Sequence, residues 1–164
     1  CLEVVLEFAG LFGNETIQKI GQNLKYDLSI LKWYDIEVEG PLFDTMLAHY
    51  LINPDMRHNM DILAETYLNY TPISITELIG KKGKNQLSMR EVPLEKQTEY
   101  AVEDADITLS AFEAFLPLLK EDGLTDLMKT VEMPLLPVLL KMEMTGVCVD
   151  REKLHTLSQS FAGQ

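Results

Sequence analysis

Cysteine, long apolar runs and positive charge are all scarce in this sequence of 164 residues. Its two cysteines, Cys1 and Cys148, are too few for a disulfide framework or a cysteine-rich zinc site. Charge or proline interrupts every apolar stretch well before the ~20 residues that a membrane span needs. No basic and apolar leader opens the chain, so we expect no signal peptide, no membrane segment and a cytoplasmic location.

An initiator methionine is also missing, since the sequence begins Cys1-Leu2-Glu3. We therefore expect the chain to be a piece of a longer protein. Its length suits one packed domain with a short part of a second. Apolar residues make up 46% and charged residues 24%, which is typical of a globular protein and excludes a disordered one.

Fourteen Lys and Arg stand against twenty-six Asp and Glu, which gives a formal net charge of −12. Taken alone, this balance argues against a nucleic-acid partner, because cationic side chains drive phosphate binding. A site that cleaves phosphodiesters is the exception. It gathers carboxylates that hold divalent cations, and the cations meet the phosphate. Simple solubility is the alternative explanation of an acidic surface.

Common cofactor motifs are absent. The three histidines, His49, His58 and His155, show no spacing typical of zinc ligands. Neither a Gly-x-x-x-x-Gly-Lys phosphate loop nor a Gly-x-Gly-x-x-Gly fingerprint occurs. The lysine-rich segment 80–85 resembles a phosphate loop only in composition, and a mobile surface loop is the better interpretation.

Apolar spacing predicts an α/β first half and a helical second half. In the first half we expect a helix over 2–11, a strand over 16–20, a helix over 24–34 capped by Asn23, a strand over 41–43, and a helix over 45–52 capped by Asp44. In the second half we expect three longer helices, over 60–68, 93–120 and 124–144. We also expect a short helix that begins at a Ser74–Glu77 capping box and a last helix that Asp150 caps. A domain boundary is expected near residues 123–130.

Asp27 is the first carboxylate whose surroundings suggest chemistry. It lies early in a predicted helix that follows a strand and Gly21, and α/β folds build their sites at the carboxyl ends of strands. Asn23, Tyr26 and Asp27 are three or four residues apart and share one helix face. An ordinary surface aspartate is the alternative, and spacing alone favours that alternative.

Tyr100 and Asp104 form the second candidate. They are four residues apart on a predicted helix, so both project from one face. A phenol and a carboxylate placed in this way can hold a water and a metal together. The alternative is that Tyr100 packs and that Glu103, Asp104 and Asp106 form a solvated acidic run, which spacing alone again favours.

Five segments in order resemble the 3′→5′ exonuclease (proofreading) domain of family-A DNA polymerases, the DNA polymerase I family. They are GQNLKYD (21–27), FDTM (43–46), RHNMDILAE (57–65), GKNQL (83–87) and YAVEDAD (100–106). Residues 132–150 resemble the beginning of the polymerase domain, at the base of its thumb. The resemblance covers nearly the whole chain, and it overturns the surface alternatives for Asp27 and Asp104.

The resemblance implies an α/β, ribonuclease-H-like 3′→5′ exonuclease fold that is truncated at the N-terminus and largely helical in its second half. It implies a partial exonuclease domain over 1–125 and the start of the polymerase domain over 126–164. The implied reaction hydrolyses the 3′-terminal phosphodiester of DNA with two Mg²⁺ ions, for which Mn²⁺ or Zn²⁺ can substitute. The longer protein would also be a DNA-directed DNA polymerase of replication and repair.

The resemblance also implies roles for single residues. Asp104 would bind one Mg²⁺ directly, Asp27 would hold the second through water, and Tyr100 would orient the attacking water. The residues implied to contact the frayed 3′ end or the DNA backbone are Gln22, Asn23, Tyr26 and Arg57. A rim salt bridge is the alternative for Arg57. Asp44 and Asp61 also lie in family motifs, but we expect a helix cap and an early-turn acid, not ligands.

The family's first motif, Asp-x-Glu, is absent in its expected place, and Glu37–Glu39 is out of order. We therefore expect the chain alone to bind metal weakly, to be inactive, and to self-associate through an exposed sheet edge. Two other functions stay open: an inactive structural module of the polymerase, and a ribonuclease of the same superfamily. The second motif, which contains Asp27, and the third, which contains Tyr100 and Asp104, are intact and disfavour the module, and the polymerase-like C-terminal segment disfavours the ribonuclease.

Overall fold

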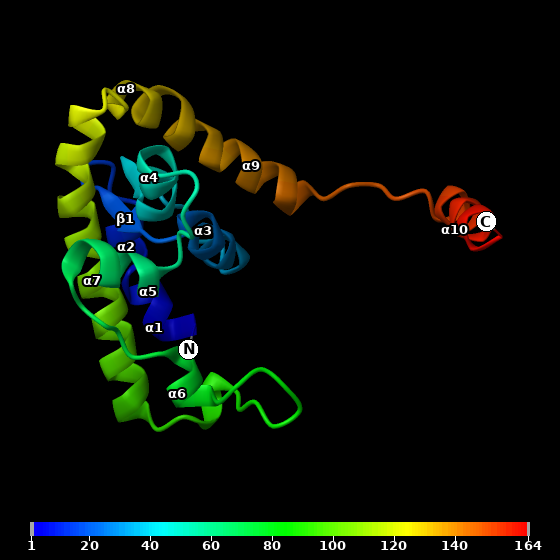
Figure 1. The fold of residues 1–164 in the computed structure, drawn as a ribbon, viewed down its shortest axis with the longest axis horizontal. Coiled ribbons are helices and arrows are strands. Elements are labelled where there is room, and N and C mark those ends of the chain that lie inside the picture. Colours follow the sequence, from blue (N-terminus) through cyan, green and yellow to red (C-terminus); the bar gives the residue numbers. More distant parts are fainter. Residues whose placement is uncertain (1, 164) are drawn as a thin grey trace.

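The computed structural model describes residues 2–163 (Figure 1), so Cys1 lies outside the described residues. In chain order the elements are α1 (Leu2–Glu7), α2 (Ala9–Phe12), β1 (Lys19–Gly21), α3 (Leu24–Trp33), β2 (Leu42–Asp44), α4 (Thr45–Ile52), α5 (Met60–Leu63), η1 (Ala64–Leu68), α6 (Ile75–Ile79), η2 (Met89–Glu91), α7 (Leu94–Glu121), α8 (Thr125–Leu127), η3 (Met128–Glu132), α9 (Met133–Thr145) and α10 (Arg151–Ala162).

A small parallel sheet lies at the centre of the first half. β1 pairs with β2 in parallel, with Ile20 opposite Phe43 and Gly21 opposite Asp44. Helix α3 connects the two strands, as parallel pairing requires. Because both strands end at the same edge, the first turns of α3 and α4 begin side by side.

The long helix α7 supplies the surface on which the sheet and α4 pack. Its buried Ala111, Phe115 and Leu119 share one apolar cluster with Phe43 and Leu63. Figure 1 shows α7 running along one side of β1, α4 and α5. Burying such side chains contributes roughly 1.5–3 kcal/mol each, so this cluster is what orients the sheet against α7.

Asp44 connects the first turns of α3 and α4. Its side chain is 2% exposed. It accepts hydrogen bonds from the backbone N–H groups of Met46 (2.8 Å) and Leu47 (3.3 Å), which confirms the predicted cap of α4. It also accepts from Asn23 N–H (3.2 Å) and Leu24 N–H (2.7 Å). Burial raises the pKa of Asp44, and these backbone donors oppose that rise.

The prediction that Asn23 caps α3 was wrong. Asn23 adopts a left-handed conformation, with φ of 61°, and its side chain makes no capping hydrogen bond. The Asp44 carboxylate caps α3 instead, from the end of the neighbouring strand. Asn tolerates this conformation better than most residues, which explains the residue type at position 23 without a cap.

Most predicted elements are present with small shifts. The first strand begins at Lys19, not at residue 16, and the segment predicted as one helix over 60–68 is an α-helical turn followed by a π-helical one. The Ser74 hydroxyl bonds to the N–H and hydroxyl of Thr76 and not to Glu77, while the reciprocal capping box forms at Ser88 and Glu91. Over residues 2–163 no helix is both long and apolar enough to cross a membrane.

A buried histidine network was not predicted. His49 is 0% exposed and lies in α4, with its Nδ1 2.7 Å from Nδ1 of His58 and its Nε2 3.1 Å from the Tyr67 hydroxyl. Its ring also stacks on Phe115, with centroids 5.7 Å apart. Burial, and then the charge of His58, lower the pKa of His49, so the ring is neutral in the folded protein near neutral pH.

Replacing Asp44 tests its capping role. We expect Asp44→Ala to lower the free energy of unfolding by about 3 kcal/mol or more, because four backbone donors lose their acceptor in a buried site. Asp44→Asn keeps one acceptor oxygen and should cost less. Urea denaturation followed by circular dichroism measures both. The exposed Asp55→Ala is the control, and equal stability of Asp44→Ala and this control would contradict the role.

The buried histidine predicts a pH dependence of stability. A pKa lowered in the folded state means that the unfolded chain binds more protons, so the free energy of unfolding should fall as pH drops below about 6.5. His49→Gln should flatten this fall, whereas His155→Gln, at an exposed position on α10, should keep it. Urea denaturation between about pH 7.5 and 5.5 measures the slope. Identical slopes for wild type and His49→Gln would refute the prediction.

Candidate active site

Asp27 and Asp104 line the same cavity, of about 420 Å³. Asp27 comes from the first turn of α3, after β1, and Asp104 comes from α7. The other lining residues are Gln18, Ile20, Gly21, Gln22, Met60, Ala105, Thr108 and Leu109. The packing of β1 against α7 therefore brings together the two carboxylates that sequence spacing left far apart.

The carboxylate of Asp27 reaches solvent, but the surrounding protein removes part of its hydration. This partial burial raises the pKa of Asp27, the backbone N–H of Asp27 opposes the rise, and the negative charge of Asp44 adds to it. The buried Asp44 therefore acts on the cavity electrostatically as well as by positioning α3. A cation beside Asp27 would relieve this repulsion.

Tyr100 and Asp104 lie one turn apart on α7 and interact. Burial, the charge of Asp104 and a hydrogen bond with Asp104 raise the pKa of Tyr100 to about 12, so its hydroxyl keeps its proton at neutral pH. Burial also raises the pKa of Asp104, the hydrogen bond from Tyr100 opposes that rise, and the charges of Glu103 and Asp61 add to it. A neutral phenol beside a carboxylate can donate to that carboxylate or orient a water.

Glu103 faces a different partner from its neighbour Asp104. Its carboxylate accepts from the Tyr70 hydroxyl (2.5 Å) and from Ile73 N–H (2.8 Å). It therefore fastens the segment before α6 to α7, and it is not part of a solvated acidic run. Nothing in the spacing of the sequence signals this bond, because its partners lie thirty or more residues away.

The residues expected at a DNA strand surround the start of α3. Tyr26 is 63% exposed, and Asn23 is also exposed. Gln22 donates to the His58 backbone carbonyl (2.6 Å) and accepts from the Thr45 hydroxyl, so both ends of its amide are bonded inside the protein. The bond to His58 holds the Arg57–His58 turn beside the α3 start.

Arg57 is exposed on that turn. Within residues 2–163 the salt bridges join Lys25 to Glu143 and Lys32 to Glu37, so the alternative of a rim salt bridge for Arg57 is not formed there.

Carboxylate oxygens are the ligands that Mg²⁺ and Mn²⁺ prefer, and Mg²⁺ commonly uses one or two carboxylates plus waters and substrate phosphates. Asp27 and Asp104 fit that chemistry, because both line one cavity and both have a pKa raised by desolvation. In the described part of the chain no group of three or more His, Cys, Asp or Glu side chains could hold a metal. The ligand set that these residues provide is therefore a pair of carboxylates.

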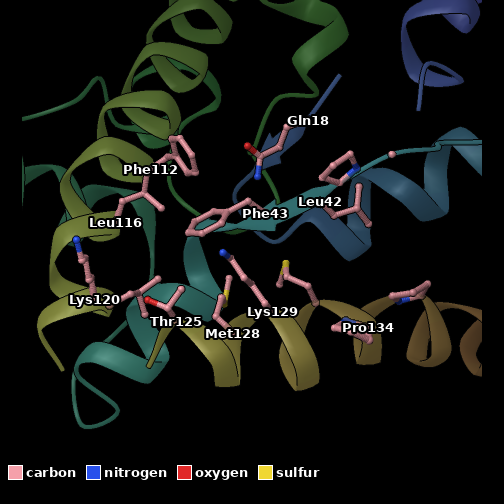
Figure 2. A pocket seen from close by; sticks show the side chains of 15 residues that line it. Gln18, Leu42, Phe43, Phe112, Leu116, Lys120, Thr125, Met128, Lys129 and Pro134 are labelled. Carbon is pink, nitrogen blue, oxygen red and sulfur yellow. The ribbon is translucent and has the colours of Figure 1, made fainter. Parts of the chain in front are cut away.

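A larger cavity, of about 1060 Å³, lies between β2, the C-terminal half of α7, η3 and the start of α9 (Figure 2). Phe43 and Phe112 form part of its wall, with ring centroids 4.7 Å apart. The side chain of Lys129 extends into the cavity. Its lining is mostly apolar and contains no carboxylate. Size alone would not select the cavity of Asp27 and Asp104, because this cavity and a third one, of about 1090 Å³ and lined by Glu77, Glu99, Glu103 and Asp106, are both larger.

A family model described as 3′-5′ exonuclease matches residues 2–120. DNA polymerase I of Rhizobium leguminosarum is 41% identical over 153 residues, which are 93% of this chain and 15% of that protein. DNA polymerase I of Borreliella burgdorferi is 39% identical over 151 residues, which are 92% of this chain and 16% of that protein. The chain thus spans less than a fifth of the length of these curated relatives.

Two solved structures share the fold. The POL domain of Pol1 from M. smegmatis, in complex with DNA primer-template and dNTP, matches with a TM-score of 0.77 and 23% identity, over 99% of this chain and 25% of that chain. Brucella melitensis NrnC matches with a TM-score of 0.71 and 23% identity, over 85% and 64%. With the family match, these likenesses confirm the predicted exonuclease-like α/β fold with a largely helical second half.

Proposed function

This chain belongs to the 3′-5′ exonuclease domain family of DNA polymerase I, and we propose from that premise that the protein containing it hydrolyses the 3′-terminal phosphodiester of DNA. The products would be deoxynucleoside 5′-monophosphates. The observation that carries the proposal is the shared cavity of Asp27 and Asp104, with the protonated Tyr100 beside Asp104. These are the residue types that a metal-assisted phosphodiester hydrolysis needs.

In this proposal Asp104 and Asp27 hold two Mg²⁺ ions, with Mn²⁺ or Zn²⁺ as substitutes. When bound, such ions neutralise the phosphate and make the attacking water more acidic. Tyr100 orients that water through its hydroxyl, which stays protonated because of its raised pKa. The two carboxylates would keep the cations at the cavity. Burial, which raises their pKa values, makes each free carboxylate less stable, and a bound cation would offset that loss.

The 3′-terminal nucleotides would lie along the start of α3. Tyr26 offers an exposed ring on which a base can stack, which is worth roughly 1–3 kcal/mol and is insensitive to base identity. Arg57 would neutralise a backbone phosphate, and Gln22 and Asn23 would line the strand. An exonuclease that must remove any terminal nucleotide benefits from contacts of this kind, because none of them reads a base edge.

The longer protein would also be a DNA-directed DNA polymerase of replication and repair, as the names of its relatives suggest. Residues 126–164 would then begin the polymerase domain, after an exonuclease part over 1–125. We infer a cytoplasmic location for such an enzyme.

A non-catalytic module is the second candidate. The observation in its favour is that residues 2–163 contain no group of three or more side chains that could hold a metal. The two candidates differ in what Asp104 does: removing it matters for hydrolysis only in the enzyme.

Substitutions in the full-length polymerase test the catalytic roles. We expect Asp104→Ala to lower the rate of 3′ trimming of a mismatched primer with Mg²⁺ by ~10²–10³, because charge stabilisation at the cleaved bond is lost. Tyr100→Phe removes one hydrogen bond to the water and should cost about tenfold. The control is Asp106→Ala, an exposed acid two residues along α7. Trimming by Asp104→Ala at the wild-type rate would reject the exonuclease and leave the module.

The 164-residue chain by itself should show no measurable trimming, because two carboxylates bind the ions weakly.

We also expect it to self-associate through the edge of β1, since among the described strands β1 pairs only with β2. Light scattering at high concentration measures the mass before the nuclease assay. A monomer would refute the association, and Mg²⁺-dependent trimming abolished by Asp27→Ala would refute the inactivity.

A further inference from the structure

The segment between Leu78 and Arg90 concentrates positive charge in an otherwise acidic chain. It contains Lys81, Lys82, Lys84 and Arg90, which are four of the fourteen Lys and Arg, and no Asp or Glu. All four side chains are exposed. Simple solubility does not require such a cluster, because a net charge of −12 already keeps the protein soluble.

The three lysines of this segment have no carboxylate partner within the described residues. The salt bridges of residues 2–163 use Lys25 and Lys32, which lie on α3. Like charges held close together repel each other, and no salt bridge among the described residues offsets that repulsion here. An anion from outside the chain is the counter-charge that this arrangement lacks.

The backbone holds these lysines in a closed loop. Gly80 ends α6 with φ of +79°, a conformation that favours glycine. Leu87 N–H then donates to the Ile79 carbonyl (2.9 Å), and Gln86 N–H donates to the Gly83 carbonyl (3.1 Å). The loop over residues 80–87, hereafter the lysine loop, is therefore closed at its base while its charged side chains stay in solvent.

The lysine loop is attached to the helix that carries Tyr100 and Asp104. On one side, Glu103 fastens the segment before α6 to α7 through Tyr70 and Ile73. On the other side, the chain enters α7 at Leu94, ten residues or about 15 Å of helix before Asp104. In Figure 1 the loop lies near the N-terminal end of α7 and extends toward the side of α7 where α1, α3 and α5 lie.

We propose that the lysine loop is a second nucleic-acid contact, which holds the phosphates of single-stranded DNA upstream of the 3′ end that is cleaved. This inference rests on the proposed function. Lysine ammonium groups on flexible stems bind phosphates as point charges and read no base sequence. The contact would therefore bind a strand of any sequence. Its binding free energy would come from the counterions that the phosphates release when the lysines bind them.

The test compares two triple variants of the full-length polymerase. Lys81→Gln, Lys82→Gln and Lys84→Gln together remove the loop charges. Lys120→Gln, Lys129→Gln and Lys141→Gln remove the same charge at the other end of α7 and on η3 and α9. The assay measures kcat and KM for trimming a long single strand across a range of salt concentrations, and for cleaving a dinucleotide.

For the loop variant we expect KM for the long strand to rise on the order of tenfold at low salt. The slope of log affinity against log salt should become shallower by up to about 2, since each single-strand phosphate contact contributes roughly 0.7. Its kcat and its cleavage of the dinucleotide should match the wild type, and the control variant should match the wild type throughout.

An unchanged KM and salt slope in the loop variant would overturn the inference. Equal loss on the long strand and on the dinucleotide would also overturn it, because the loop would then support the fold of the site and not the strand. A wild-type enzyme that cleaves neither substrate would reject the proposed function instead, so the two failures are distinguishable.

Discussion

One buried carboxylate, that of Asp44, determines how the first half of the chain is arranged. It ends β2, and its oxygens accept hydrogen bonds from the first turns of both α3 and α4. A buried charge of this kind is tolerated only where several donors surround it. Two helix starts provide those donors, so α3, α4 and the ends of both strands are held as one unit. Asp27 takes its place because it lies in the turn of α3 that Asp44 caps.

The same arrangement has an electrostatic consequence for the cavity. Burial is the main cause that raises the pKa of Asp27 and of Asp104; the charge of Asp44 adds to the rise for Asp27, and the charges of Glu103 and Asp61 add to the rise for Asp104. Carboxylates that repel one another in this way disfavour ionisation, and a divalent cation removes the conflict. The cavity thus holds two partly desolvated carboxylates whose neighbours add further negative charge, and perturbed pKa values of this kind are typical of functional sites.

Local patterns predicted much of this fold because their partners lie within one or two turns. The cap of α4 by Asp44 and the cap of α10 by Asp150 are of this kind, and both are present. The bonds that the sequence could not predict join residues far apart: Asp44 to α3, Glu103 to Tyr70, and His49 to Tyr67. The wrong cap at Asn23 has the same cause, since its spacing fits a cap but a distant carboxylate already serves that helix. Asp27 and Asp104 became a pair only through the packing of β1 on α7.

The acidic balance of the chain now has a physical place in the proposed function. An excess of carboxylates repels DNA unless positive charge is supplied where the strand lies. In the proposed function divalent cations would supply it at the cleaved bond, where Asp27 and Asp104 line the cavity, and Arg57 would supply it beside the start of α3. A strand would then meet positive charge at those places and at the lysine loop, and the acidic surface elsewhere would repel it. Net charge alone therefore does not exclude a nucleic-acid partner, because it averages over a surface on which a few cations matter by position.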